Sequence, residues 1–236
     1  MNIACPDFIS AIDPDLCRAV DHYCERTSAA LDAEPINAMT NGAFLIASWS
    51  AWHLLSKHSP ASDSILTRTL IVITALVGAG SFVFHTVATR WAEWLDVVPI
   101  LLFMVIYLWL VLTRFMGWSS LKTTLAVLGF FITTFALEAL VPGKVLWGGA
   151  MYLPTIALLG ILTAVFHARV GTSAGNAFAT ATGVFFLSFA ARSLDPLVCG
   201  MWPMGTHFLW HLLNALLLFV LIRVVIVHGP NGRKTT

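Results

Sequence analysis

The chain has 236 residues, of which 58% are hydrophobic and 11% charged, and its formal net charge is +1. A soluble domain carries roughly a quarter charged residues. Together with a mean hydropathy of +0.83, this composition excludes an ordinary soluble globule and favours a protein that exposes apolar surface to lipid. The near-neutral charge gives no indication of nucleic acid as a partner, and no protein partner is indicated either.

The first 35 residues precede the first long apolar run. They lack the charged start and apolar core of a secretory signal and carry Asp7, Asp13, Asp15 and Asp21 instead. We therefore expect an N-terminal extramembrane segment over residues 1–35, a transmembrane domain over 36–227 and a short tail over 228–236.

Seven apolar runs of about 20 residues follow, and each is long enough to cross a bilayer as a helix. Charged or turn-forming residues separate them. The sequence thus predicts an all-α polytopic membrane protein, a bundle of seven transmembrane helices over Ile36–Leu55, Ile65–Val87, Ala92–Thr113, Lys122–Val141, Val145–Phe166, Ala177–Leu194 and Thr206–Val227.

The distribution of Lys and Arg predicts the orientation of the bundle, since cytosolic loops carry an excess of positive charge. Of the 13 Lys and Arg residues, eight fall on the side of the C-terminus and five on the side of the N-terminus. We therefore expect a cytosolic C-terminal tail and an N-terminus outside, in the periplasm or a lumen.

Polar and ionisable side chains of the predicted helices gather at one depth. In the expected orientation they lie near the outer face, although they are far apart in the sequence. Ionisable groups inside a bilayer are costly and normally face the interior of a bundle with partners. This layer is therefore the candidate functional site, and its members include Glu34, Asn37, Asn41, Ser81, His85, Asp96, Glu138, His207 and His211.

Three histidines of this layer form a candidate metal site. His207 and His211 are four residues apart, which places both imidazoles on one helix face, and His85 supplies a third ligand at matching depth. A pair at this spacing also arises by chance, but three neutral imidazoles with an open fourth position are typical of catalytic zinc. The sequence therefore predicts that zinc binds here.

Ser81 and Asp96 are the candidate catalytic residues. Ser81 lies one helical turn before His85, and Asp96 follows after a short turn. A carboxylate near a metal-activated water can accept a proton, and a hydroxyl can stabilise a developing oxyanion. The alternatives are an ordinary interfacial carboxylate for Asp96 and, for Ser81, close helix packing next to the small residues 78–80.

The motifs that carry these residues resemble the alkaline ceramidase family, within the larger superfamily that includes the adiponectin-type receptors. The resemblance extends over nearly the whole chain, and the Tyr-Cys-Glu and Glu-x-x-Asn elements favour the ceramidase branch. The matching segments are Tyr23-Cys24-Glu25-Arg26, Ala33-Glu34-Pro35-Ile36-Asn37 through Asn41, Ser81-Phe82-Val83-Phe84-His85 with Asp96, and Gly205-Thr206-His207-Phe208-Leu209-Trp210-His211.

This resemblance implies a zinc-dependent hydrolase that cleaves the amide bond of ceramide, or of a related lipid amide, to a sphingoid base and a fatty acid. It thereby implies a role in sphingolipid metabolism, with a lipid substrate drawn from the bilayer. By position, His85, His207 and His211 would hold zinc. Asp96 would be the general base, and Ser81 would stabilise the oxyanion.

The resemblance also implies a disulfide and a calcium ion beside the zinc layer. The disulfide would join Cys24 to Cys199, and the alternative is two free thiols. Calcium prefers six or more oxygen ligands, and His22 and Thr27 stand where the animal pattern has aspartate and asparagine. The implied calcium ligands are His22, Tyr23 through its carbonyl, Glu25, Thr27 and Glu34.

Two other functions stay open at this point. One is a seven-helix receptor or transporter-like membrane protein with a structural zinc and little or no hydrolase activity. The other is a hydrolase of a different lipid amide or of an ester. Ser81 and Asp96 favour chemistry over the receptor, because a structural zinc needs neither side chain.

Overall fold

The computed structural model of the chain describes residues 5–58, 64–142, 146 and 149–229. The described structure is helical, with one isolated antiparallel bridge between Ala19 and Thr89. Its α-helices are α1 (Asp7–Ile12), α2 (Pro35–Thr40), α3 (Gly42–Ser56), α4 (Ile65–Val87), α5 (Arg90–Leu110), α6 (Ser120–Leu140), α7 (Leu153–Arg169), α8 (Thr172–Val198) and α9 (His207–His228).

Among the described residues, six helical stretches are long and apolar enough to span a bilayer: Ile65–Val87, Arg90–Phe115, Ser120–Leu140, Ala150–Arg169, Thr172–Val198 and His207–His228. They agree with six of the predicted spans and fit an integral multi-pass membrane protein. The α8 helix extends beyond the predicted bounds at both ends. Val145, where the fifth span was expected to begin, lies outside the described residues, as do residues 230–236 of the predicted tail.

The seven-helix count is not confirmed, because the first predicted span is divided into α2 and α3. The division falls at Asn41, whose side-chain amide donates to the carbonyl of Asn37 (2.9 Å). The Thr40 hydroxyl likewise donates to the carbonyl of Ile36 (2.8 Å). Such side chains compete with the backbone for its own acceptors, so the helix is interrupted here, close to the polar layer.

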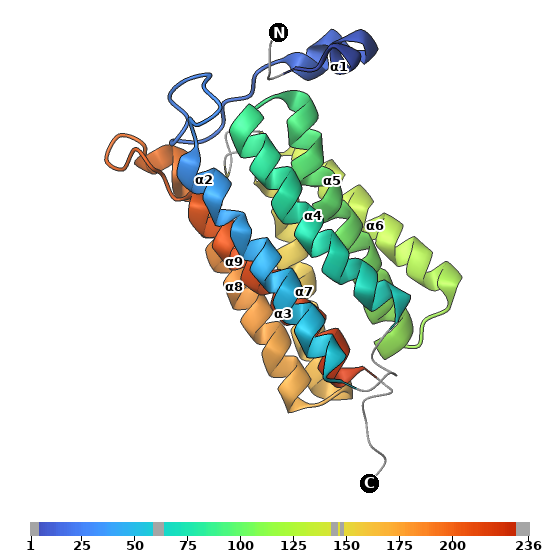
Figure 1. Ribbon diagram of the computed structural model, residues 1–236. Helices are drawn as coiled ribbons and strands as arrows, with labels where there is room; N and C mark the ends of the chain where they lie inside the picture. Colours follow the sequence, from blue (N-terminus) through green and yellow to red (C-terminus); the bar gives the residue numbers. More distant parts are fainter. Residues whose placement is uncertain (1–4, 59–63, 143–145, 147–148, 230–236) are drawn as a thin grey trace.

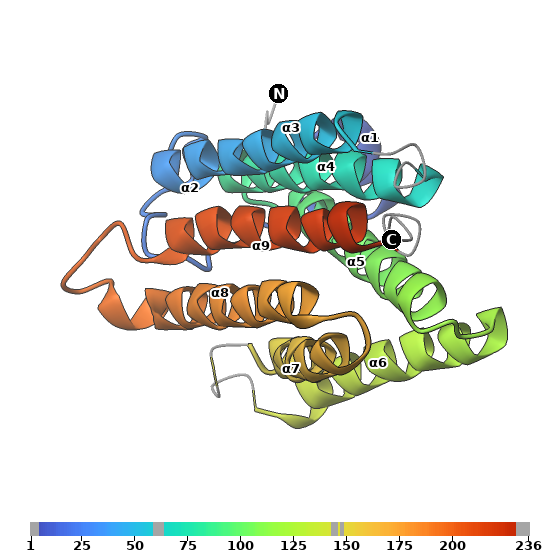
Figure 2. The ribbon, with the colours of Figure 1, turned by 90° about the horizontal axis from the view of Figure 1, so that it is seen from below.

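The helices form a bundle in which α9 is central. It packs against α8 on one side and against α3 and α4 on the other, while α5 packs along α4 and α7 along α8. Figure 2 shows α9 between these two groups of helices, with α6 at the outer edge. The side chains of His207, Trp210 and His211 at the N-terminal end of α9 therefore lie in the interior of the bundle, whereas Leu209 and Leu212 are exposed on its surface.

The N-terminal segment covers one end of the bundle. The backbone of Val20 donates to the carbonyl of Ala88 (2.9 Å), and Arg90 donates to the carbonyl of Arg18 (3.1 Å). These bonds attach the segment to the short connection between α4 and α5. In Figure 1 the α1 helix lies at this end and the C-terminal end of α3 at the other, so the segment covers the end where the polar layer is found.

A close approach at Gly80 determines how α4 and α5 pack beside that layer. A Cβ atom on Gly80 would overlap the backbone carbonyl of Leu95 on α5. Small residues at such contacts allow helix backbones to approach. Since Ser81 follows Gly80 and Asp96 follows Leu95, the same contact brings the two candidate catalytic residues near one another.

Gly80→Ala is expected to lower the free energy of unfolding by about 1–3 kcal/mol, because the added methyl group must push two helix backbones apart. Thermal unfolding in detergent measures the effect. Gly129→Ala on α6 is the matched control, since nothing lies within 4 Å of its Cβ position, and its stability should equal or exceed that of wild type. Equal melting temperatures for both variants would contradict this account of the α4–α5 contact.

Candidate metal centre

Three buried histidines meet at one point inside the bundle. His85 comes from the last turn of α4, and His207 and His211 come from the first two turns of α9. One ligand atom from each lies within 4.8 Å of the others, and no other group of this kind occurs in the described part of the chain. The three side chains are 0%, 2% and 1% exposed. The central position of α9 thus turns a local sequence pattern into a three-histidine cluster.

Each histidine presents one ring nitrogen without a protein partner. Among the described residues, Nε2 of His85, Nδ1 of His207 and Nε2 of His211 find no hydrogen bond. Leaving a buried polar atom unsatisfied costs about 1–3 kcal/mol, so three such atoms in one place need a common partner. Three neutral imidazole nitrogens are a normal donor set for a transition-metal ion, and the site fits one.

The opposite nitrogens of two histidines are held by side chains of the α2 region. Nδ1 of His85 lies 2.6 Å from Oε2 of Glu34. Nδ1 of His211 lies 3.0 Å from the hydroxyl of Thr40. Because this hydroxyl already donates its proton to the carbonyl of Ile36, the His211 imidazole is the donor in its contact with Thr40. Such contacts fix the tautomer and ring orientation of a metal ligand. Both histidines consequently direct Nε2 towards the centre of the cluster.

Glu34 is a charged group in a nearly closed environment, only 3% exposed. Burial disfavours its charge, but hydrogen bonds from His85, Asn37 and Arg26 outweigh this effect and lower the pKa of Glu34 below its usual value. An ionised carboxylate behind a ligating imidazole raises the basicity of that ligand. Glu34 therefore suits the role of supporting His85.

A cavity opens beside the histidines. Ser81, Asp96 and His211 line it together with many apolar side chains. It follows α5 from Asp96 as far as Leu108, roughly 18 Å at 1.5 Å per residue. The Asp96 carboxylate has the Ser81 hydroxyl and the His85 imidazole among its polar neighbours. The arrangement combines a metal ligand, a carboxylate and a hydroxyl at the polar part of a long apolar chamber.

The family model for Ceramidase matches residues 19–232. The chain belongs to the ceramidase family. The match includes all three histidines, Ser81 and Asp96, and it confirms the resemblance drawn from the motifs. Neither the curated proteins nor the solved structures give a significant individual match. Membership in this family supports a membrane enzyme that hydrolyses the amide bond of ceramide.

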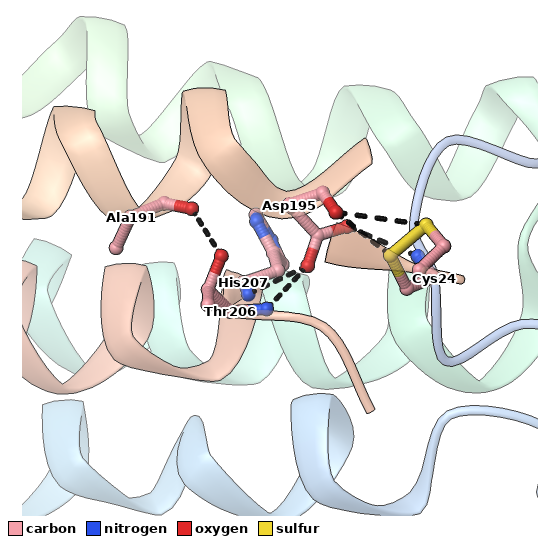
Figure 3. The surroundings of a disulfide bond; sticks show 6 residues. Cys24, Ala191, Asp195, Thr206 and His207 are labelled. Carbon is pink, nitrogen blue, oxygen red and sulfur yellow. Dashed lines mark hydrogen bonds between the residues drawn. A yellow bond between two sulfur atoms is a disulfide. The ribbon is translucent and has the colours of Figure 1, made fainter. Parts of the chain in front are cut away.

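In this ceramidase-family protein, Asp195 anchors the start of the helix that carries His207. Its Oδ1 accepts hydrogen bonds from the backbone N–H groups of Thr206 (2.6 Å) and His207 (2.9 Å), and its Oδ2 accepts one from Cys24 (3.0 Å). Figure 3 shows the carboxylate between these groups. A carboxylate at a helix N-terminus satisfies free N–H groups and complements the helix dipole, so Asp195 holds one metal ligand by its backbone.

Two disulfides hold the N-terminal segment. Cys24 is joined to Cys199, with a Cα–Cα distance of 5.1 Å, next to Asp195. Cys5 is joined to Cys17, a pair that no sequence motif indicated. The role of Asp195 was also missed, because nothing in the spacing of the chain indicates that a carboxylate on α8 reaches the first N–H groups of α9.

The five residues implied as calcium ligands do not form a set of free oxygens. His22 is exposed and lies 3.4 Å from Glu93, and the carbonyl of Tyr23 accepts a hydrogen bond from the backbone N–H of Arg26 (3.2 Å). The carboxylate of Glu25 accepts the N–H groups that begin α2, and Glu34 is occupied as described above. Thr27 is exposed. Because calcium wants six or more oxygens, these residues do not fit a calcium ion.

Proposed function

We propose that this protein is an intramembrane zinc-dependent amidohydrolase that cleaves ceramide or a related lipid amide to a sphingoid base and a fatty acid. One observation carries the proposal: His211, a member of the buried cluster with His85 and His207, lines an apolar cavity together with Ser81 and Asp96. A receptor with a structural metal has no need of this carboxylate and hydroxyl beside an apolar cavity.

Each residue of the site has a separate role in the proposed hydrolysis. His85, His207 and His211 would hold the ion, and zinc bound by three imidazoles activates water near neutral pH and polarises a carbonyl. Asp96 accepts the proton of the attacking water and returns it to the leaving amine. Ser81 donates a hydrogen bond to the amide oxygen as negative charge develops on it.

The apolar lining of the cavity excludes water from the hydrocarbon part of the substrate. Phe103, Leu108 and Leu221 lie along it, away from Asp96. A chain of a lipid amide can lie against such residues while its amide bond stays beside the histidines. Burial of each methylene contributes about 0.8 kcal/mol, which favours long-chain over water-soluble amides as substrates.

The proposal includes seven membrane-crossing elements, with α2 and α3 acting together as the first. Residues 35–56 extend over about 33 Å at 1.5 Å per helical residue, which matches the hydrocarbon thickness of a bilayer. The N-terminal segment 1–35 would then lie outside, and the tail 228–236 would lie in the cytosol, as the Lys and Arg distribution indicates. The metal layer would lie near the outer leaflet surface.

Metal analysis and a substrate panel test the proposal directly. The protein purified in detergent should contain one zinc per chain and release fatty acid from at least one ceramide. The panel should also contain other lipid amides and a lipid ester of equal chain length. Zinc without turnover of any of these lipids would refute the hydrolase and favour the receptor or transporter-like alternative. Turnover of the ester alone would refute the amidohydrolase assignment.

A further inference from the structure

We propose that the guanidinium group of Arg26 takes the place of the calcium ion in this chain and positions Glu34 behind His85. The proposal rests on the proposed function only in so far as His85 holds a metal. It assigns to Arg26 a positioning role, and it implies that the protein neither binds calcium at this site nor depends on it.

Arg26 occupies the centre of the N-terminal loop next to the metal layer. Its side chain is 6% exposed. Nε donates to Oε1 of Glu34 at 2.5 Å, and one terminal nitrogen donates to the carbonyl of His85 at 3.0 Å. The other terminal nitrogen reaches the carbonyls of Ser28 (3.2 Å) and Ala30 (3.4 Å). A single buried cation thus gathers one carboxylate and three backbone carbonyls.

These acceptors are of the kind that a calcium ion would coordinate. Calcium binds carboxylate and carbonyl oxygens, whereas a guanidinium satisfies the same oxygens with five N–H donors in a fixed plane. Both oxygens of Glu34 are engaged, since Oε1 accepts from Arg26 and Oε2 accepts from Asn37 (3.1 Å) and contacts His85 (2.6 Å). Both oxygens are thus committed to nitrogen donors, and the guanidinium charge next to Oε1 repels a divalent cation.

The carboxylate of Glu25 also has other partners, because it caps the start of α2. Oε1 accepts the N–H of Ile36 (2.7 Å), and Oε2 accepts the N–H of Asn37 (2.8 Å), at the start of α2. The two carboxylates among the implied calcium ligands are therefore used for a helix start and for an ion pair. Arg26 supplies the positive charge that a calcium ion would otherwise supply to Glu34.

Arg26 affects the metal centre through its contact with Glu34. Arg26 and Asn37 hold the carboxylate so that Oε2 meets Nδ1 of His85, which leaves Nε2 of His85 free to face His207 and His211. Arg26 also contacts the backbone of His85 itself. One side chain thus holds the ligand by both its backbone and its imidazole.

The first arm of the test uses the wild-type protein in its zinc-loaded form. Its melting temperature in detergent should be the same in calcium-depleted buffer with saturating zinc and in the same buffer with millimolar calcium chloride, and lipid-amide turnover should not respond to the added calcium. A higher melting temperature in calcium would overturn the proposal, whatever the protein hydrolyses. This arm requires no variant and so no assumption about folding.

The second arm measures zinc affinity by competition with a chromophoric chelator. Arg26→Gln should raise the zinc dissociation constant by about 10–100-fold, because Glu34 loses its counter-charge and its fixed orientation. Arg26→Lys keeps the charge and should recover part of this loss. Arg90→Gln is the matched control, since Arg90 pairs with Asp15 at 2.5 Å but both side chains are at least 40% exposed, and its zinc affinity should equal that of wild type.

Unchanged zinc affinity in Arg26→Gln would overturn the proposal, as would equal losses in Arg26→Gln and Arg90→Gln. Failure of the proposed function has a different signature. A protein that binds zinc and loses affinity on Arg26→Gln, yet hydrolyses no lipid, would support the role of Arg26 and refute the enzyme.

Discussion

Replacing His211 with alanine is expected to remove the bound metal and to lower lipid-amide hydrolysis by about 10³-fold or more. His211 is the ligand that also lines the cavity, and two imidazoles alone leave a transition-metal site incomplete. Metal content by mass spectrometry and fatty acid release under saturating ceramide measure the two effects. No second group of three potential ligands occurs in the described part of the chain, so the ion has no alternative site of this kind there.

His53→Ala provides the control for this experiment. His53 is an exposed residue of α3 that stacks on Trp49 with ring centroids 5.8 Å apart, and its removal should leave metal content and turnover unchanged. Full metal occupancy in His211→Ala would contradict the three-histidine centre. So would an equal loss of metal in both variants.

Asp96→Asn is expected to keep the metal but to lower kcat by about 10²–10⁴-fold, the usual contribution of a general base. The amide preserves the size of the side chain and can still accept a hydrogen bond from Ser81, but it cannot take a proton from water at neutral pH. Metal content and single-turnover hydrolysis separate binding of the ion from the chemical step. Loss of both together would assign Asp96 to metal retention instead.

Glu93→Gln is the matched control for Asp96→Asn. Glu93 lies on the same helix, one turn nearer the N-terminus, and its side chain is 39% exposed beside His22. The substitution removes a carboxylate charge from the same end of the bundle, and Glu93 is not among the residues that line the cavity. A comparable loss of kcat in both variants would indicate a general electrostatic effect and count against Asp96 as the base.

The membrane class and most helix positions could be predicted because they depend on local composition. An apolar run such as Ile65–Val87 must be helical in lipid, where backbone groups find no water, and α4 has these bounds. The motifs were also sufficient to indicate the ceramidase family. The first span shows the limit of this reasoning, since its apolar content does not reveal that Thr40 and Asn41 compete for the carbonyls that would continue the helix.

The candidate site, like the fold, could be predicted only in part from the sequence. The i,i+4 pair of His207 and His211 is a local pattern, so its shared helix face could be predicted. The partners of Glu34, Arg26 and Asp195 could not be predicted, because the sequence contains several chemically suitable partners for each of these charged side chains. Which partner it takes depends on how the N-terminal segment is placed across the bundle.

By itself, the sequence determined that this chain faces lipid, that its apolar runs are helices, and that it carries histidines, a serine and an aspartate in a ceramidase-like order. These properties follow from composition and from spacing within single helices. Only the tertiary structure decided that Arg26 neutralises Glu34, that Asp195 caps the helix of His207, and that Cys5 pairs with Cys17. The physical reason is that hydrogen bonds and ion pairs are short-ranged and directional, so their partners are chosen by packing between distant segments.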